Sequence, residues 1–151
     1  CEILHMYAPG PEKIDFEVTM AEGHTDIEHV RDVMQQLQMY QIGFVLSDFD
    51  PSDVDFESVA MLPFRAIKFS AECVRKACEN RAYYDVIGML VDLLKEHGHA
   101  IAFKGINNDE LEDIAVSLGA DYMQGEKYAK PFPIEELEMQ MQMSRERVFL
   151  D

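Results

Sequence analysis

The sequence predicts an α/β fold built from parallel β/α units, with about five strands. Short segments rich in β-branched and apolar residues alternate along the chain with longer segments whose apolar residues recur every three or four positions. Glycines, prolines and helix-capping residues stand between these segments. With 151 residues, 48% of them hydrophobic, the chain is long enough for one domain with a substantial core. Strands that alternate with helices in this way form a parallel sheet with right-handed crossovers.

The first unit opens with an alternating, β-rich strand at Lys13 to Thr19. A turn at Gly23 and a capping residue, Asp26, follow this strand, and the next apolar residues then have helical spacing. These residues are Ile27, Val30, Val33, Met34 and Leu37. Gly43 is expected to end the helix that they form.

Prolines mark the second unit. Phe44 to Ser47 is a short apolar strand, after which Pro51 and Ser52 open a helical turn that runs through Val59 to Leu62. Pro63 is expected to stop that turn, because proline cannot continue a helix interior.

The remaining units repeat the strand and helix pattern. Their expected strands are Ala66 to Phe69, His99 to Phe103 and Asp121 to Met123. Their expected helices are Ala71 to Asn80, Ala82 to His97, a helix from a capping Asp109 through Leu118, and a last helix from Ile134 to about Met143. Gly98 and Gly119 directly follow two of these helices, at positions where glycine commonly ends a helix.

Charge and cysteine content exclude several classes of protein. The formal net charge of −16 argues against nucleic-acid binding, which usually needs a basic surface. No apolar run is long enough to span a membrane, so no membrane contact is expected from this chain. The three cysteines show no metal-ligand spacing and favour a reducing, cytoplasmic location over a disulfide framework.

Candidate functional residues fall where the expected strands end. In a parallel sheet built from β/α units, functional side chains gather at the carboxyl ends of the strands. The residues at those ends are Met20, Asp48, Ser70, Lys104 and Gln124. This placement predicts a shared pocket without specifying a reaction.

Five short motifs carry a resemblance to a known family. In chain order they are FEVTM from Phe16, LSDFD from Leu46, AIKFS from Ala66, FKGIN from Phe103 and QGEKYAKPFPIEEL from Gln124. This series resembles the EAL family of cyclic di-GMP phosphodiesterases, and the last motif is its most specific part. The resemblance covers about residues 13–137 and implies the C-terminal part of a TIM-type (β/α)₈ barrel, a fold of about 250 residues. Since the chain opens with Cys1 and shows no Glu-Ala-Leu motif, residues 1–151 are expected to be a single EAL-like domain fragment.

The resemblance also implies that most acidic positions of the family's site are altered. Met20 stands where the family has a glutamate, and Ser47 and Ser70 each stand where it has an aspartate. Lys104 and Asn107 stand in place of two further glutamates. Of the metal-binding and catalytic positions, only Asp48 and Lys68 survive, and Gln124 with Gly125 matches the closing motif of the family. We therefore treat Lys68 as a vestigial catalytic residue and Asp48 as a vestigial metal ligand.

Active members of the family use Mg²⁺ or Mn²⁺, which are hard cations that need oxygen anions as ligands. At ~4 Å and an effective dielectric constant near 20, a lysine at position 104 would repel each unit of metal charge by about 4 kcal/mol. No metal cofactor is therefore expected. Lys104 either forms a salt bridge with Asp48 in place of the ion or turns toward solvent.

The leading functional prediction is a catalytically inactive, EAL-like signalling domain that acts through protein contact or by regulating an attached domain. A homodimer is a further expected assembly, although the loop from Asp50 to Ser58 differs from the loop that couples dimerisation to metal binding in active relatives. One alternative is a receptor that binds cyclic di-GMP weakly without hydrolysing it, with Lys104, Gln124 and Lys68 as its anchors. The other is a residual phosphodiesterase that needs an N-terminal half.

Overall fold

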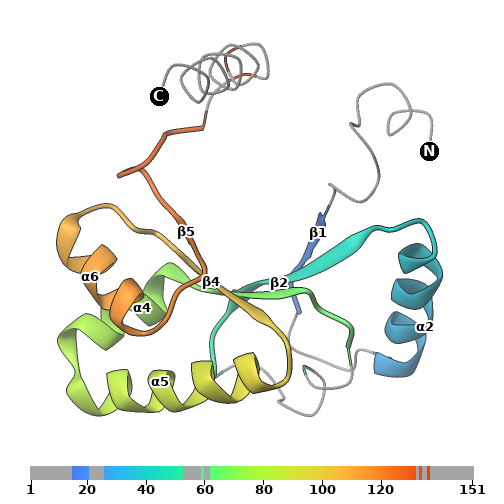
Figure 1. The fold of residues 1–151 in the computed structure, drawn as a ribbon, viewed down its shortest axis with the longest axis horizontal. Helices are drawn as coiled ribbons and strands as arrows, with labels where there is room; N and C mark the ends of the chain where they lie inside the picture. Colours follow the sequence, from blue (N-terminus) through green and yellow to red (C-terminus); the bar gives the residue numbers. More distant parts are fainter. Residues whose placement is uncertain are drawn as a thin grey trace, which may run out of the picture.

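Five parallel strands lie side by side in the order in which they occur along the chain (Figure 1). The computed structural model describes residues 15–20, 26–52, 59, 62–131, 133 and 136. The strands are β1 (Asp15–Val18), β2 (Gly43–Phe49), β3 (Ala66–Phe69), β4 (Ala100–Lys104) and β5 (Tyr122–Gln124). Their number, order and direction confirm the predicted parallel sheet.

The helices follow the strands as the alternating pattern requires. They are α2 (Ile27–Gln38), α4 (Ala71–Glu79), α5 (Arg81–Glu96) and α6 (Asp109–Ser117). In Figure 1, α4, α5 and α6 gather on one side of the sheet, and α2 lies at the far end beside β2. Each helix begins at a residue whose side chain accepts a hydrogen bond from the backbone amide three positions later. The capping residues are Asp26, Ser70, Asn80 and Asn108.

One face of the sheet is apolar and packs against the helices. Phe69 lies at the centre of this face, with its ring centroid 5.0 Å from that of Phe49 and 4.9 Å from that of Phe103. All three rings are fully buried. Ile87 and Val91 of α5 belong to the same core. This packing fixes the orientation of the strands, because alternate side chains must then point to the opposite face.

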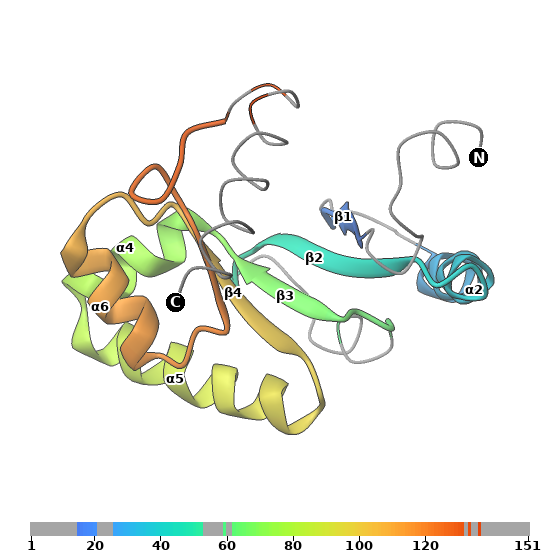
Figure 2. The same cartoon turned by 45° about the horizontal axis from the view of Figure 1, so that its top comes forward.

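The opposite face carries the polar residues of the strands, and we call it the inner face. Glu17 pairs in register with Val45, Lys68 with Ala102, and Lys104 with Gln124. Paired residues of neighbouring strands share a face. The inner face therefore includes Glu17, Val45, Ser47, Ala66, Lys68, Ala102, Lys104 and Gln124. Figure 2 shows how the sheet twists and curves from β2 to β4.

A bulge near the end of β2 changes which residues reach the inner face. Leu46 pairs with Ile67 and Phe49 pairs with Phe69, so β2 has one residue more than β3 over this interval. Asp48 lies in the bulge with φ of 56°, in the left-handed region that Asp tolerates better than most residues. The bulge returns Phe49 to the apolar face while Asp48 remains 46% exposed at the inner face.

Several predicted element boundaries are corrected by the structure. Gly43 does not end α2; that helix is capped at Met39, and Gln41, with φ of 63°, makes the turn into β2. Gly43 is instead the first residue of β2. The cap of α6 is Asn108 and not Asp109, because the Asn108 side chain is the one that accepts from Leu111 N. The second error arises because Asn108 and Asp109 offer equivalent capping chemistry.

The other predicted elements have mixed outcomes. Gly98 and Gly119 follow their helices with φ of 88° and 85°, which confirms them as helix ends. The predicted helical turn before Pro63 and the predicted last helix lie largely outside the described residues. Within the described part of the chain, no helix combines the length and apolar character needed to cross a membrane.

Candidate functional site

The carboxyl ends of all five strands bring charged and polar side chains together on the inner face. Lys68 lies in β3, at the centre of the sheet, and its side chain is only 13% exposed. Its ammonium group contacts the carboxylate of Glu17 in β1 and donates a hydrogen bond of 3.1 Å to Gln124 Oε1 in β5. One lysine thus joins both edge strands to the central strand.

This arrangement shows that the sheet is strongly curved. In a flat sheet, β1 and β5 would lie four strand spacings apart, which is about 19 Å at ~4.8 Å per spacing. No single ammonium group could contact both. The contacts of Lys68 therefore require that the edges curl toward each other over the inner face, as in the wall of a barrel.

A second ion pair crosses the first. Lys104, the last residue of β4, contacts the carboxylate of Asp48 in β2 and so reaches over β3. The Lys104 side chain is 30% exposed. Of the two placements expected for Lys104, the structure has the salt bridge and not the solvent-directed side chain.

The charges of the two lysines affect Glu17 together. The hydrogen bond from Lys68 holds the pKa of the Glu17 carboxyl below its usual value, against a smaller opposing effect of desolvation. A hydrogen bond with Ser47 and the positive charge of Lys104 lower this pKa further. Glu17 is therefore ionised at neutral pH and belongs to the same electrostatic group as Ser47, Lys68 and Lys104.

The other altered positions have structural roles. Ser70 caps α4 by accepting a hydrogen bond from Cys73 N at 3.2 Å. Asn107 Oδ1 accepts from the backbone amide of Glu126 at 3.2 Å, which holds the chain after β5 against the chain after β4. Neither side chain supplies an anionic oxygen at the strand ends, and Met20 packs against the apolar core.

Asp50 holds the chain just after β2. Its carboxylate accepts from the amide and hydroxyl of Ser52 at 3.0 and 2.6 Å, and Lys76 of α4 lies 3.6 Å away. Burial raises the pKa of Asp50, but the hydrogen bonds from Ser52 and the charge of Lys76 outweigh it and leave this pKa lowered. The side chain is directed to α4 and not to the lysines of the inner face.

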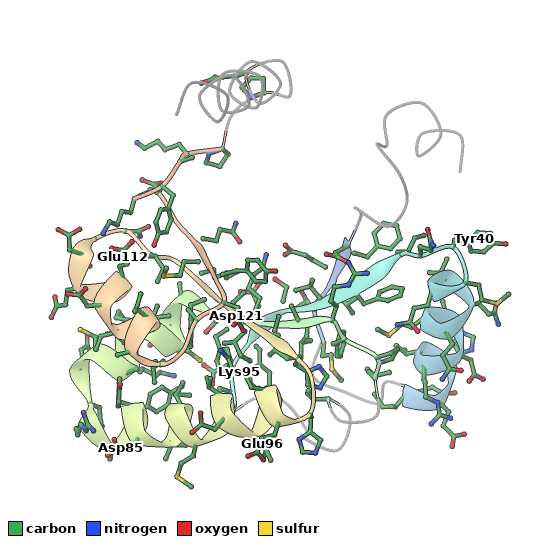
Figure 3. All side chains as sticks on the ribbon, viewed as in Figure 1. Tyr40, Asp85, Lys95, Glu96, Glu112 and Asp121 are labelled. Carbon is green, nitrogen blue, oxygen red and sulfur yellow. The ribbon has the colours of Figure 1, made fainter. Side chains whose placement is uncertain are left out.

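Sequence reasoning missed two features. It did not identify Glu17 as the partner of Lys68, although Glu17 occupies an alternate position of β1 that the strand period could have assigned to the inner face. It also missed Lys127, whose ammonium group contacts Glu112 and lies 2.5 Å from Asp109 on α6. Glu112, which Figure 3 labels on α6, also accepts a 2.6 Å hydrogen bond from Tyr128. These contacts anchor the segment that follows β5.

The residues at the strand ends do not fit a divalent metal ion. The described parts of the chain contain no group of three or more His, Cys, Asp or Glu side chains placed to hold a metal. Glu17 and Asp48 supply the carboxylates here, and each contacts a lysine. An ion would have to displace these ammonium groups and would still lack the oxygen anions that Mg²⁺ and Mn²⁺ require.

A separate pocket of about 540 Å³ lies at the opposite end of the sheet, where β2 begins. Gln38, Gly43, Phe44 and Arg65 are among its lining residues. In β/α barrels, residues at this end serve stability, whereas functional residues lie at the carboxyl ends of the strands. The pocket is therefore distinct from the site described here.

Comparison with known proteins gives a consistent assignment. The family model described as "EAL domain" matches residues 1–131. Cyclic di-GMP phosphodiesterase PdeF of Escherichia coli K12 is 23% identical over 133 residues, which cover 88% of this chain and 18% of PdeF. The chain thus spans less than a fifth of that relative.

Solved structures with the same fold are also EAL proteins. The EAL domain of Mycobacterium smegmatis DcpA superimposes with a TM-score of 0.82 at 17% identity, over 94% of this chain and 64% of that chain. A standalone EAL protein from Vibrio cholerae O395 in its c-di-GMP-bound form has a TM-score of 0.77 at 19% identity, over 86% of this chain and 55% of that chain. The curved sheet is accordingly part of a TIM-type barrel, and the chain belongs to the EAL domain family.

Proposed function

We propose that this chain is a cyclic di-GMP signalling domain that does not hydrolyse the dinucleotide and that acts through contact with a protein partner or by regulating an attached domain. The observation that carries the proposal is the pairing of both strand-end carboxylates with lysines. Phosphodiester hydrolysis by metal ions needs bound cations that activate a water and neutralise the developing charge. The side chains present at this site already neutralise one another.

The sheet supports a role in protein contact. Among the described strands, β1 and β5 lie at the edges of the sheet, each hydrogen-bonded to one neighbouring strand. Sheet edges are ready sites for pairing with further strands from the same protein or from another chain. The net charge of −16 favours partners with basic surfaces. A second copy of this chain is one candidate partner.

A receptor that binds cyclic di-GMP without cutting it is the second candidate. Lys68, Lys104 and Gln124 converge at the strand ends, which favours this alternative because ammonium and amide groups can contact phosphate and base edges. Two of these residues are already engaged in ion pairs, so a dinucleotide would have to replace Glu17 and Asp48 as their partners. We therefore expect binding to be weak.

The test is an assay of cyclic di-GMP hydrolysis in Mg²⁺ and in Mn²⁺, together with calorimetric titration of the protein with the dinucleotide. We expect no turnover above the non-enzymatic background, with an active EAL phosphodiesterase as positive control. Metal-dependent turnover that disappears in the Asp48→Asn variant would overturn the proposal and favour a residual phosphodiesterase. Binding without turnover, abolished by Lys104→Met, would favour the receptor.

The proposed contact with a partner needs its own measurement. Sedimentation of the purified protein at increasing concentration reports whether it self-associates, and a mass that stays monomeric leaves another protein or an attached domain as the partner. Hydrogen exchange then reports whether the backbone amides of β1 and β5 become protected in the complex. Protection confined to the helices would contradict contact through the sheet edges.

A further inference from the structure

Two crossed ion pairs occupy the strand ends, and together they span the whole sheet. Lys68 joins β1, β3 and β5, whereas Lys104 joins β4 to β2. Glu17 and Asp48 contribute two negative charges and the lysines two positive charges, so the formal sum is zero. Each pair joins two strands that are separated by at least one other strand. A metal ion with ligands from both strands would join them in the same way.

We infer that Lys104 serves as a built-in cation that occupies the place of a divalent ion between β2 and β4, and that this one side chain keeps metal ions out of the site. The inference rests on the proposed non-hydrolytic function. The contact between the Lys104 ammonium and the Asp48 carboxylate carries it, since the only carboxylate that β2 offers at the strand ends is already neutralised.

The backbone geometry supports a fixed position for this pair. Asp48 lies in the β2 bulge directly before Phe49, whose buried ring packs edge-on against Phe69, so the backbone position of Asp48 is held by this packing. Lys104 ends β4 and is followed by Gly105, with φ of 79°, at a point where a Cβ would lie 2.3 Å from the Cβ of Ala71. Both ends of the pair are thus set by close packing on the apolar side of the sheet.

Reversing the charge at position 104 should convert the strand ends into a site that binds a divalent metal ion. In Lys104→Glu, the carboxylates of Glu17, Asp48 and the new side chain would face one another, giving the oxygen anions that a hard divalent cation needs. Lys68 can remain in place because Gln124 provides its second acceptor. In Lys104→Gln, the repelling charge is removed but no anionic ligand is added, so this variant should bind a metal with intermediate affinity.

The matched control is Lys95→Glu. Lys95 of α5 and Asp121, before β5, lie near one another in Figure 3 and form an ion pair of 3.0 Å. The Lys95 side chain is 36% exposed, close to the 30% of Lys104. The variant therefore makes the same change in net charge, by breaking a similar pair, at a place remote from the strand ends.

The experiment follows Mn²⁺ by paramagnetic broadening of backbone and side-chain amide signals in NMR spectra of the full chain. This readout separates a site at the strand ends from weak binding elsewhere on an acidic protein. In Lys104→Glu, the side-chain amide of Gln124 and the backbone amide of Ala102 should broaden at a Mn²⁺ concentration at least tenfold lower than in the wild type. Lys95→Glu should match the wild type, and Lys104→Glu combined with Asp48→Asn should lose the gain.

Two results would overturn the inference. One is selective broadening of Gln124 by Mn²⁺ in the wild type at the concentration that suffices for Lys104→Glu. The other is the absence of any gain in both Lys104→Glu and Lys104→Gln; the neutral variant serves this purpose if charge reversal prevents folding. Either result is distinguishable from a failure of the proposed function, which the assay of cyclic di-GMP hydrolysis by the wild type tests separately.

Discussion

The ammonium group of Lys104 contacts the carboxylate of Asp48 although β3 lies between their strands. Two neighbouring features make this contact feasible. The curvature of the sheet shortens the distance between β2 and β4 on the inner face, and the β2 bulge turns Asp48 toward that face. The pair is partly exposed, with 30% of the Lys104 side chain and 46% of the Asp48 side chain open to solvent. Its energy is accordingly that of a surface pair.

A double-mutant cycle should measure that energy. Lys104→Met and Asp48→Asn remove one charge each, and asparagine also tolerates the left-handed backbone of position 48. The coupling free energy from denaturant unfolding should be about 0.3–1 kcal/mol, as for exposed ion pairs, and should decrease in high salt. A coupling of several kcal/mol would show that the pair is buried more deeply than in this structure, and a coupling of zero would show that the contact is not populated.

Replacing Lys68 should cost more than replacing Lys104. The Lys68 side chain is 13% exposed and has acceptors in both edge strands. Lys68→Met leaves Glu17 and Gln124 without this shared donor, and we expect a loss of about 1.5–3 kcal/mol in the free energy of unfolding. Lys130→Met, at a side chain that is 77% exposed, is the control and should change stability by less than about 0.5 kcal/mol. Equal effects of the two substitutions would contradict the bridging role of Lys68.

Glycine-to-alanine substitutions should differ in their effect on stability, depending on whether the added Cβ meets backbone atoms or open space. A Cβ at Gly125 would lie 1.9 Å from the carbonyl oxygen of Ile106, and backbone atoms cannot easily move away. Gly125→Ala should therefore destabilise the fold by about 3 kcal/mol, at the upper end of overpacking effects. Gly88→Ala in α5 meets nothing closer than 3.8 Å and should stabilise by up to about 1 kcal/mol through helix propensity.

Thermal or denaturant unfolding of these two variants checks the ranking. Gly43→Ala makes a useful third case, because its Cβ would collide mainly with the ends of the Asp15 and Arg65 side chains. Those groups form an exposed ion pair of 2.9 Å and can rotate away. Its cost should therefore fall between those of the other two variants. A harmless Gly125→Ala would show that the chain after β5 does not approach Ile106 closely.

The attachment of the segment after β5 to α6 should depend on pH. The hydrogen bond from Lys127 lowers the pKa of Asp109, and hydrogen bonds from Lys127 and then Tyr128 lower the pKa of Glu112. Because both folded-state values lie below the usual carboxyl values of 3.8 and 4.5, the stabilisation is fully present above about pH 5. It is lost as the pH falls through the lowered values.

Carboxyl NMR titration gives the measurement. In Lys127→Met, the pKa of Glu112 should rise toward its usual 4.5, since its first and strongest partner is removed. In Lys130→Met, which removes a nearby lysine that pairs with Glu126 at 3.8 Å, the pKa of Glu112 should stay where it is in the wild type. A Glu112 pKa unaffected by Lys127→Met would mean that the contact with the ammonium group does not persist in solution.

Much of the fold followed from local patterns in the sequence. The apolar residues of α2 recur at helical spacing, Asp26 has the short side chain that a helix start requires, and Gly98 and Gly119 meet the need for a left-handed residue at a helix end. These signals act over a few residues, so they are visible without tertiary structure. Where two adjacent residues offered the same chemistry, as Asn108 and Asp109 do, the sequence could not choose between them.

The sequence also predicted which residues lie at the carboxyl ends of the strands. The carboxyl ends of parallel strands share one edge of the sheet, which predicts that Asp48, Lys104 and Gln124 lie together. The motifs that resemble the EAL family pointed to the same residues. The sequence also indicated that few anionic ligands remain among them.

The partners of Lys68 were decided by the tertiary structure alone. Lys68 lies 51 residues from Glu17 and 56 from Gln124, and nothing in either neighbourhood encodes the contact. The pairing depends on the curl of the whole sheet, which brings β1 and β5 within reach of one ammonium group. The bulge in β2 depends in turn on the packing of Phe49 against Phe69. Long-range packing of the apolar face thus determines which charges meet on the other face, because a side chain's direction in a sheet follows from its register with the neighbouring strands.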